Sequence, residues 1–403
     1  MTRARAAARL AASPLVDRWG WERWKRAGLY TRVHSNLDPE THIREAADWM
    51  CRAQDHGDDR GVSYGAVFGE GFLPSYPETT GYIINTFLKL ASHYGNHDYA
   101  RRAKEMGRWE AAIQMDCGAV MGGMINSEPT PAVFNTGMVL LGWADLYRRT
   151  GADEFRTAGI RAGQWLLDMQ ESNGQWVRGN SLFAATAITV HNVKAAWGLA
   201  EMGAALGEKA FVEAATRNAE FAIGKQHENG WFEDCCLEDG QRPLLHTIAY
   251  TMQGLMGVGR IAGRKDLIER AARTARSLMT LMRDDGFVPG RIDRDFRGAA
   301  SWCCLTGTAQ TSIVWSELAA ATGDPDFADA AERANRYLMA RHDTSNLDPT
   351  LRGAVPGSWP VWGHYGRLRV LNWATKFLTD ALLERIENRV GTVPRGDTPW
   401  KSS

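Results

Sequence analysis

The chain has 403 residues, in which 47 lysines and arginines balance 47 aspartates and glutamates, so the formal net charge is zero. This balance argues against a general nucleic-acid binder, which needs a basic face to neutralise phosphates. No apolar run approaches the roughly 18 residues of a membrane span, and residues 1–16 lack the apolar segment of a signal peptide, so we expect a cytoplasmic protein without a membrane span.

One amphipathic helical pattern recurs along the chain at a nearly constant interval. Each copy opens with a polar residue, continues with an aromatic or aliphatic anchor and ends near a glycine turn. The anchors are Ile43, Tyr99, Phe155, Phe211, Leu267 and Phe327, which lie 56, 56, 56, 56 and 60 residues apart. This regularity predicts one supersecondary unit per interval.

A second and more apolar helix is predicted after each glycine turn. These runs begin near Thr80, Thr136, Asn192, Thr247, Thr306 and Asn372. A helix that is apolar on most faces is buried, so this set is predicted to form an inner ring, with the charged first set outside it. The sequence therefore predicts an all-α (α/α)6 toroid over residues 36–387, with an N-terminal extension at 1–35 and a flexible tail at 388–403.

The first turns of the inner helices are expected to line one mouth of a central cavity. The four threonines at these starts, Thr80, Thr136, Thr247 and Thr306, are expected to act as N-caps. His191 and His246 hold matching positions in neighbouring repeats and are expected to face the cavity. The candidate catalytic residues are Glu78, Asn135, His191, His246, Tyr250 and Asp234.

Aromatic, amide and charged side chains in and beside the loops that precede the inner helices are candidates for sugar binding. Aromatic rings stack on the apolar faces of sugars, and polar groups bind the hydroxyls. The candidate binding residues are Tyr76, Asn192, Trp231, Arg291, Trp302, Gln310, Trp359, Trp362, Tyr365, Asn372 and Lys376. Arginines in these loops are suited to grip a carboxylate.

The residues leave several reactions open. Hydrolysis of a glycosidic bond needs an acid and a base, for which Glu78 and Asp234 are candidates. A β-elimination needs a base beside a uronate carboxylate, and His191, His246 or Tyr250 suits that role. Two opposed histidines also suit an epimerase, and a sugar-binding protein without turnover is a further alternative.

Other toroid chemistry has weaker support in the sequence. The segment Asp293-Arg294-Asp295-Phe296 is an incomplete version of the DxDD pattern of terpene cyclases. Asp234, Cys236 and His246 supply three possible zinc ligands, but the spacing matches no prenyltransferase site. We therefore expect neither a metal nor another cofactor.

Four segments resemble an uncharacterised group found with bacterial polysaccharide-biosynthesis genes: SYPETTGY (75–82), LLHTIAYTMQGL (244–255), WCCLTGTAQ (302–310) and GSWPVWGHYGRLRVLNWATKF (357–377). The segment FNTGMVLLGWADLYRRTG (134–151) is similar to the inner-helix start of unsaturated glucuronyl and rhamnogalacturonyl hydrolases. This resemblance implies action on a bacterial, uronic-acid-containing polysaccharide or oligosaccharide, with hydrolysis slightly favoured. Those hydrolases carry an aspartate where this chain has Asn135. Two explanations stay open: Asn135 is a natural change with altered chemistry, or it is an engineered substitution that traps substrate. The oligomeric state stays open.

Overall fold

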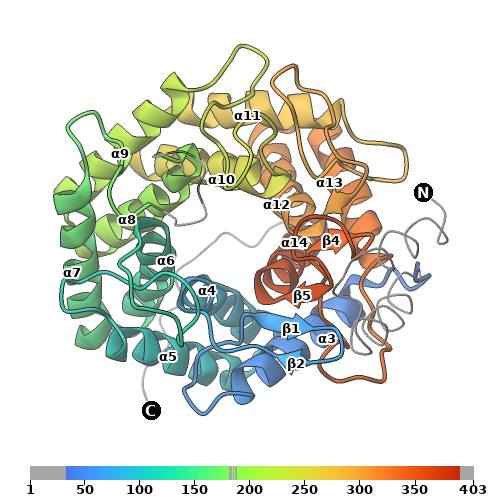
Figure 1. The fold of residues 1–403 in the computed structure, drawn as a ribbon, viewed down its shortest axis with the longest axis horizontal. Coiled ribbons are helices and arrows are strands. Elements are labelled where there is room, and N and C mark those ends of the chain that lie inside the picture. Colours follow the sequence, from blue (N-terminus) through green and yellow to red (C-terminus); the bar gives the residue numbers. More distant parts are fainter. Residues whose placement is uncertain (1–32, 181–183, 185, 187, 391–403) are drawn as a thin grey trace, which may run out of the picture.

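The computed structural model describes residues 33–180, 184, 186 and 188–390, and every structural statement below concerns these residues. Twelve α-helices form two concentric rings (Figure 1). The outer ring holds α3 (Pro39–Asp55), α5 (His97–Ala112), α7 (Asp153–Met169), α9 (Lys209–Gly224), α11 (Lys265–Met279) and α13 (Pro325–Met339). The inner ring holds α4 (Pro77–Tyr94), α6 (Val133–Thr150), α8 (Val193–Leu206), α10 (Leu245–Ala262), α12 (Leu305–Thr322) and α14 (Asn372–Val390). The predicted (α/α)6 toroid is confirmed.

The ring closes through contacts between the two ends of the described chain. Each inner helix packs against the next along the chain, and α14 packs against α4. Each outer helix packs mainly on the inner helix that precedes it, so the first outer helix, α3, packs on the last inner helix, α14. The predicted extension and tail lie largely outside the described residues, and α14 continues past residue 387 to Val390.

Glycines let neighbouring inner helices approach closely. A Cβ atom on Gly198 of α8 would lie 1.8 Å from the carbonyl oxygen of Gly137 on α6. The preceding pair is built in the same way, because a Cβ on Gly142 of α6 would lie 2.2 Å from the oxygen of Gly81 on α4. Only glycine fits such contacts, and these residues therefore set the radius of this part of the ring.

Five of the inner helices end at a glycine. Gly95, Gly151, Gly207, Gly263 and Gly323 each end an inner helix in the left-handed conformation, with φ between 62° and 75°. Glycine adopts this conformation without steric cost, so each chain reversal into the next outer helix is encoded locally.

The threonines at the inner-helix starts do not act as N-caps, and that prediction is wrong. Thr80 lies inside the first turn, where its hydroxyl donates to the carbonyl of Tyr76 at 2.9 Å and accepts the amide N–H of Val62 at 2.9 Å. Thr136 makes the equivalent pair of bonds to Ala132 and Val120. These threonines tie the preceding loop to the helix, which fixes the position of the first turn.

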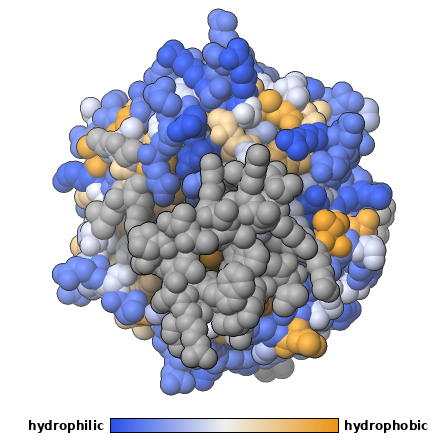
Figure 2. Space-filling model, turned by 45° about the vertical axis from the view of Figure 1, so that its right-hand side comes forward, coloured by the Kyte–Doolittle hydropathy of each residue, from blue (hydrophilic) through white to orange (hydrophobic). Residues whose placement is uncertain are grey.

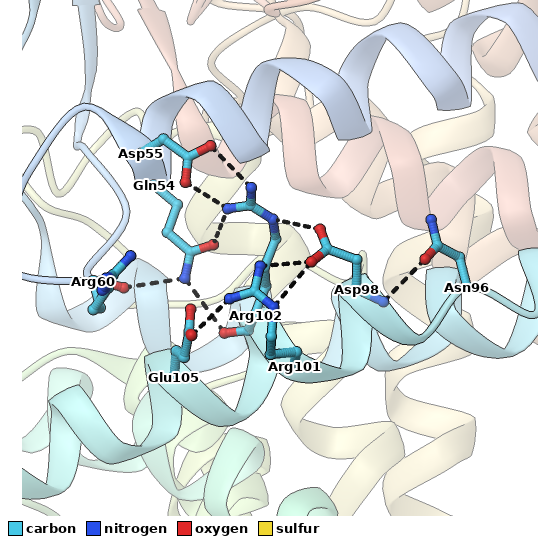
Figure 3. A network of polar contacts seen from close by, with 8 residues as sticks. All are labelled: Gln54, Asp55, Arg60, Asn96, Asp98, Arg101, Arg102 and Glu105. Carbon is cyan, nitrogen blue, oxygen red and sulfur yellow. Dashed lines mark hydrogen bonds and ion pairs between the residues drawn. The ribbon is translucent and has the colours of Figure 1, made fainter.

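Polar contacts of the outer ring also follow the repeat. Gln54, Gln114, Gln170 and Gln226 each donate an amide hydrogen to a backbone carbonyl of the next outer helix, at 2.8–3.3 Å. Around Gln54, Arg102 bridges α3 and α5 through Asp55 and Asp98 (Figure 3). The same polar contact therefore recurs between four successive pairs of outer helices.

Short strands join the loops at the inner-helix N-termini. The strands β1 (Gly65–Val67), β2 (Gly71–Phe72) and β5 (Arg369–Leu371) form an antiparallel sheet in the order β2-β1-β5, with Ala66 opposite Val370. The strands β3 (Cys303–Cys304) and β4 (Ser358–Trp359) pair antiparallel, with Cys303 opposite Trp359. The sixth loop is therefore hydrogen-bonded to both the first and the fifth.

The surface of the described residues is mainly hydrophilic in the view of Figure 2. Large apolar side chains are exposed at Val33, Val177 and Leu347. Of the twelve described tryptophans nine are buried, so most of them serve the core. Within the described part of the chain, no helix has the length and apolar character needed to cross a membrane.

Candidate active site

The first turn of α4 carries the central carboxyl group of the candidate site. Pro77 starts the helix and Glu78 follows it, partly exposed and held by the hydroxyl of Tyr76, which donates to Glu78 Oε2 at 2.7 Å. Burial of the carboxyl outweighs this hydrogen bond and raises the pKa of Glu78 to about 7. At neutral pH the group therefore exists in both protonation states, which suits an acid or a base.

His246 lies in the first turn of α10, and His191 lies in the short 3₁₀ turn (Val190–Asn192) that leads into the neighbouring inner helix α8. His246 is 5% exposed, and its Nδ1 lies 2.6 Å from Oε1 of Gln310. His191 is 3% exposed, and its Nδ1 has no hydrogen-bond partner among the described residues. Burial lowers the pKa of His191 to about 3 and that of His246 to about 4, so both imidazoles are neutral at pH 7.

Aromatic rings connect these groups across the interior of the ring. The ring of Tyr250 lies 4.3 Å from that of His246 and 4.9 Å from that of Phe134, measured between centroids. Phe134 in turn lies 5.4 Å from the ring of His191. Burial and, second, the charge of Glu78 raise the pKa of Tyr250 well above its usual value, so this phenol stays protonated. We call Tyr76, Glu78, Phe134, His191, His246 and Tyr250 the first-turn cluster.

A tyrosine pair lies one helical turn below Glu78. The hydroxyl of Tyr82 on α4 is 3.2 Å from the hydroxyl of Tyr250 on α10. These helices stand on opposite sides of the inner ring (Figure 1), so this contact spans its interior. Phe377 of α14 packs against both tyrosines. The three rings form a floor beneath the first-turn cluster.

Tyr365 of the sixth loop forms an aromatic wall together with Trp373 and Tyr64. Tyr365 packs 5.2 Å from the His246 ring, and its hydroxyl accepts the indole N–H of Trp373 at 2.8 Å. Trp373 contacts Tyr64 at 4.7 Å and Tyr76 at 6.0 Å. The predicted binding residues Tyr76 and Tyr365 are thereby joined to the candidate catalytic residues.

Three other predicted binding residues of the inner ring have structural partners. Asn372 is fully buried, and its amide donates to Ser63 O and Thr79 Oγ1. Lys376 forms an ion pair of 2.6 Å with Asp380 below the floor. Asn192 is 2% exposed and donates to Asn180 at 3.4 Å. Their partners give them a role in holding the ring together.

Four predicted loop residues are also held by structural contacts. Asp234 forms an ion pair of 3.0 Å with Lys225, beside the end of the outer helix α9, and so pairs with no member of the first-turn cluster. Arg291 donates to the carbonyl of Arg242 at 2.8 Å, which links the fourth and fifth loops. The indoles of Trp231 and Trp302 are 4% and 8% exposed, so their faces pack within the protein. The catalytic role predicted for Asp234 and the binding roles predicted for the other three residues stay predictions.

The two remaining tryptophans of the sixth loop are partly exposed. Trp359 belongs to β4, and Trp362 packs against the edge of the core. Among the described residues, neither tryptophan has a ring contact with His246 or Tyr250, and their binding role stays a prediction.

Asn135 lies in the first turn of α6, directly after Phe134. Its amide donates to the carbonyl of Met121 at 2.9 Å, and the residue is 5% exposed. This bond needs an N–H donor, and an aspartate carboxylate would bring two oxygens together. The local structure of this chain is therefore suited to the amide.

Several members of the site were not predicted from the sequence. Tyr82 lies four residues after Glu78, so the spacing that indicated Tyr250 after His246 would also have found it. Lys194 of α8, which donates to Gln253 of α10 at 3.1 Å, is a lysine within an apolar helix, and this was a usable signal. Phe134 and Gln253 carried no signal, because their partners belong to other helices and depend on the ring geometry.

The described residues contain no group of three histidine, cysteine, aspartate or glutamate side chains placed to hold a metal ion. What the first-turn cluster offers is proton transfer at Glu78, neutral imidazoles, and phenols that stay protonated. Buried aromatic rings surround these groups and strengthen electrostatic interactions by keeping water away.

Comparisons with known proteins show similarity in fold and not in sequence. No protein-family model matches the sequence, and no curated protein is similar to it in sequence. An unsaturated glucuronyl hydrolase specific for heparin has a TM-score of 0.69 at 14% identity, over 87% of this chain and 98% of that chain. The unsaturated glucuronyl hydrolase of a Bacillus species has a TM-score of 0.65 at 16% identity, over 88% and 98%.

A cellobiose 2-epimerase from Bacillus thermoamylovorans has a TM-score of 0.69 at 11% identity, over 86% of this chain and 98% of that chain. An Asp-to-Asn variant of the unsaturated glucuronyl hydrolase of Streptococcus agalactiae, complexed with dGlcA-GalNAc6S, has a TM-score of 0.66 at 12% identity, over 90% and 95%. This chain therefore shares the (α/α)6-toroid fold of these sugar-processing enzymes.

Proposed function

We propose that this chain is a carbohydrate-active enzyme that hydrolyses a glycosidic bond, with Glu78 as the general acid. The observation that carries the proposal is the carboxyl of Glu78, whose pKa of about 7 leaves it substantially protonated at neutral pH. An acid of this kind donates its proton to the departing glycosidic oxygen, as carboxyl groups with raised pKa values do in glycosidases.

The substrate that we propose is an acidic oligosaccharide or the end of an acidic polysaccharide. Three of the four structural neighbours described above are unsaturated glucuronyl hydrolases, and one of them is complexed with dGlcA-GalNAc6S. In this chain Arg369 is exposed at the start of β5. Burial raises the pKa of Tyr64, beside the aromatic wall, and the positive charge of Arg369 opposes this rise. The floor formed by Tyr82, Tyr250 and Phe377 favours a chain end over a strand that threads the ring.

Proton abstraction from a sugar carbon is the second candidate, as in a β-elimination or an epimerisation. The observation that favours it is the pair of neutral histidines, because neutral imidazoles are able to accept a proton. The first turns of the other five inner helices contain no acidic residue, so a second carboxyl group for hydrolysis is not supplied from there.

The test is digestion of uronate-containing oligosaccharides and bacterial polysaccharides, with new reducing ends and the ultraviolet absorbance of a C4=C5 double bond measured together. Wild type is compared with Glu78→Gln and with Glu228→Gln, which alters an exposed glutamate. We expect reducing ends without absorbance, lost in Glu78→Gln and retained in Glu228→Gln. Absorbance that rises with the reducing ends would instead establish elimination, and sugar binding without turnover would overturn the assignment as an enzyme.

A further inference from the structure

Four buried polar side chains form a hydrogen-bonded chain that leads to His246. Lys194 Nζ on α8 donates to Gln253 Oε1 on α10 at 3.1 Å. Gln310 Nε2 on α12 donates to the same oxygen at 3.4 Å, and its Oε1 lies 2.6 Å from His246 Nδ1. All four residues are 6% exposed or less. The chain therefore links three neighbouring inner helices within the ring.

The direction of each bond can be followed from the amide oxygen of Gln253, which two donors share. Burial lowers the pKa of Lys194 well below its usual value, and this lysine has hydrogens to donate in both its charged and its neutral form. It therefore holds the oxygen of Gln253 toward itself, and that oxygen also receives the amide hydrogen of Gln310. The oxygen of Gln310 is then left to face Nδ1 of His246. Because this oxygen only accepts, Nδ1 carries the hydrogen, and Nε2 of the neutral imidazole keeps its lone pair.

We infer that Lys194 is a positioning residue that acts through Gln253 and Gln310 to set the tautomer of His246, so that Nε2 is available as a proton acceptor. The inference rests on the proposed function only for the use of that acceptor in catalysis. Within the described part of the chain, the buried Nδ1 of His191 has no hydrogen-bond partner. A buried N–H without an acceptor is costly, so we expect His191 to carry its hydrogen on Nε2, opposite to His246.

Packing alone does not account for a lysine at this position. The Nζ atom of Lys194 lies 3.9 Å from the centre of the Trp197 ring, and the residue is 4% exposed. A methionine would fill a similar volume without the cost of removing a charged or polar group from water. The amide oxygen of Gln253 is the hydrogen-bond acceptor that the structure gives this lysine.

The tautomer can be read directly from the nitrogen resonances of the full-length, ¹⁵N-histidine-labelled protein, with His246 assigned by the signals lost in His246→Gln. We expect hydrogen on Nδ1 in the wild type and a change of about tenfold in the tautomer ratio in Lys194→Met, as for the loss of one buried hydrogen bond. Gln253→Glu is the matched control, because a carboxylate in its place still only accepts and the ratio should not change.

A second variant keeps the inference testable if Lys194→Met does not fold. Gln310→Leu removes the acceptor next to His246 and should change the ratio in the same direction. An unchanged ratio in either folded variant would overturn the inference, whatever its effect on stability. Absence of turnover on every sugar would remove the proposed function but leave the tautomer result standing, so the two failures are distinguishable. Where turnover exists, Lys194→Met should lower kcat by about tenfold or more with little change in KM.

Discussion

Replacing Tyr76 with phenylalanine isolates the hydrogen bond that holds Glu78. The phenol donates to Glu78 Oε2 at 2.7 Å, and it stabilises the ionised carboxylate against the effect of burial. A hydrogen bond to a charged group contributes about 1.5–3 kcal/mol, and about 1.4 kcal/mol corresponds to one pKa unit. Tyr76→Phe should therefore raise the pKa of Glu78 from about 7 by roughly one to two units.

The sign of the effect on activity depends on the role of Glu78. If the protonated carboxyl is the general acid, activity falls as pH rises through the pKa, and Tyr76→Phe should move this alkaline limb of the kcat/KM profile upward by about one to two pH units. If the carboxylate is a base, the acidic limb moves upward instead, and activity at pH 7 falls by about fivefold to fiftyfold. The limb of the profile that shifts, alkaline or acidic, therefore distinguishes proton donation from proton abstraction.

The measurement does not require a known substrate. The carboxyl of Glu78 can be titrated by carbon NMR in protein labelled at glutamate, with the signal assigned by Glu78→Gln. Tyr99→Phe is the control, because Tyr99 lies on the outer helix α5 and packs against Phe87. A Glu78 pKa near its ordinary value in the wild type, or one that Tyr76→Phe does not move, would refute this account of the site.

Three further predictions concern the fold and Asn135. Gly198→Ala should lower the free energy of unfolding by about 1–3 kcal/mol in urea denaturation, because the added Cβ would meet the oxygen of Gly137; an unchanged midpoint would contradict the close helix contact. Asn135→Asp should cost about 1–3 kcal/mol by the same assay, and less at acidic pH, since a protonated carboxyl again donates to Met121. Burial lowers the pKa of His342 from 6.5 to about 3, so its contribution to stability is complete above pH 6.5 and is lost as pH falls toward 3. The stability of wild type should thus decline below pH 6.5 more steeply than that of His342→Asn, by about 1.4 kcal/mol per pH unit, and parallel curves would contradict this.

The sequence was sufficient for the architecture because the information is local and repeated. The five glycines that end inner helices, such as Gly95 and Gly151, act within one turn of the chain, and the spacing of the anchors reports the size of each hairpin. The same locality explains why first-turn residues such as Glu78 and His246 were placed correctly at the inner-helix starts. Their position follows from the repeat and not from their partners.

Predictions that depended on the partner of a side chain were less successful. Asp234 pairs with Lys225 nine residues earlier, and nothing in the sequence distinguishes this ion pair from an inward-facing carboxylate. The threonine Thr80 bonds back along its own helix, although threonine at a helix start usually caps it. The pKa of Glu78 is set by burial among residues from several repeats, which no single segment encodes.

The first turns of the inner helices supply one carboxyl group for the cleavage of a glycosidic bond. Hydrolysis needs one group that protonates the leaving oxygen and another that accepts a proton from water. Glu78 is the one acidic residue in the first turns of the six inner helices, and Asn135 offers an amide in place of a carboxylate. The acceptor must then come from a neutral group, and Nε2 of His246 meets that need if its Nδ1 hydrogen is held by Gln310. An elimination would use the same two groups with the proton moving first from carbon, so the order of proton transfers, and not the set of residues, separates the two reactions on this scaffold.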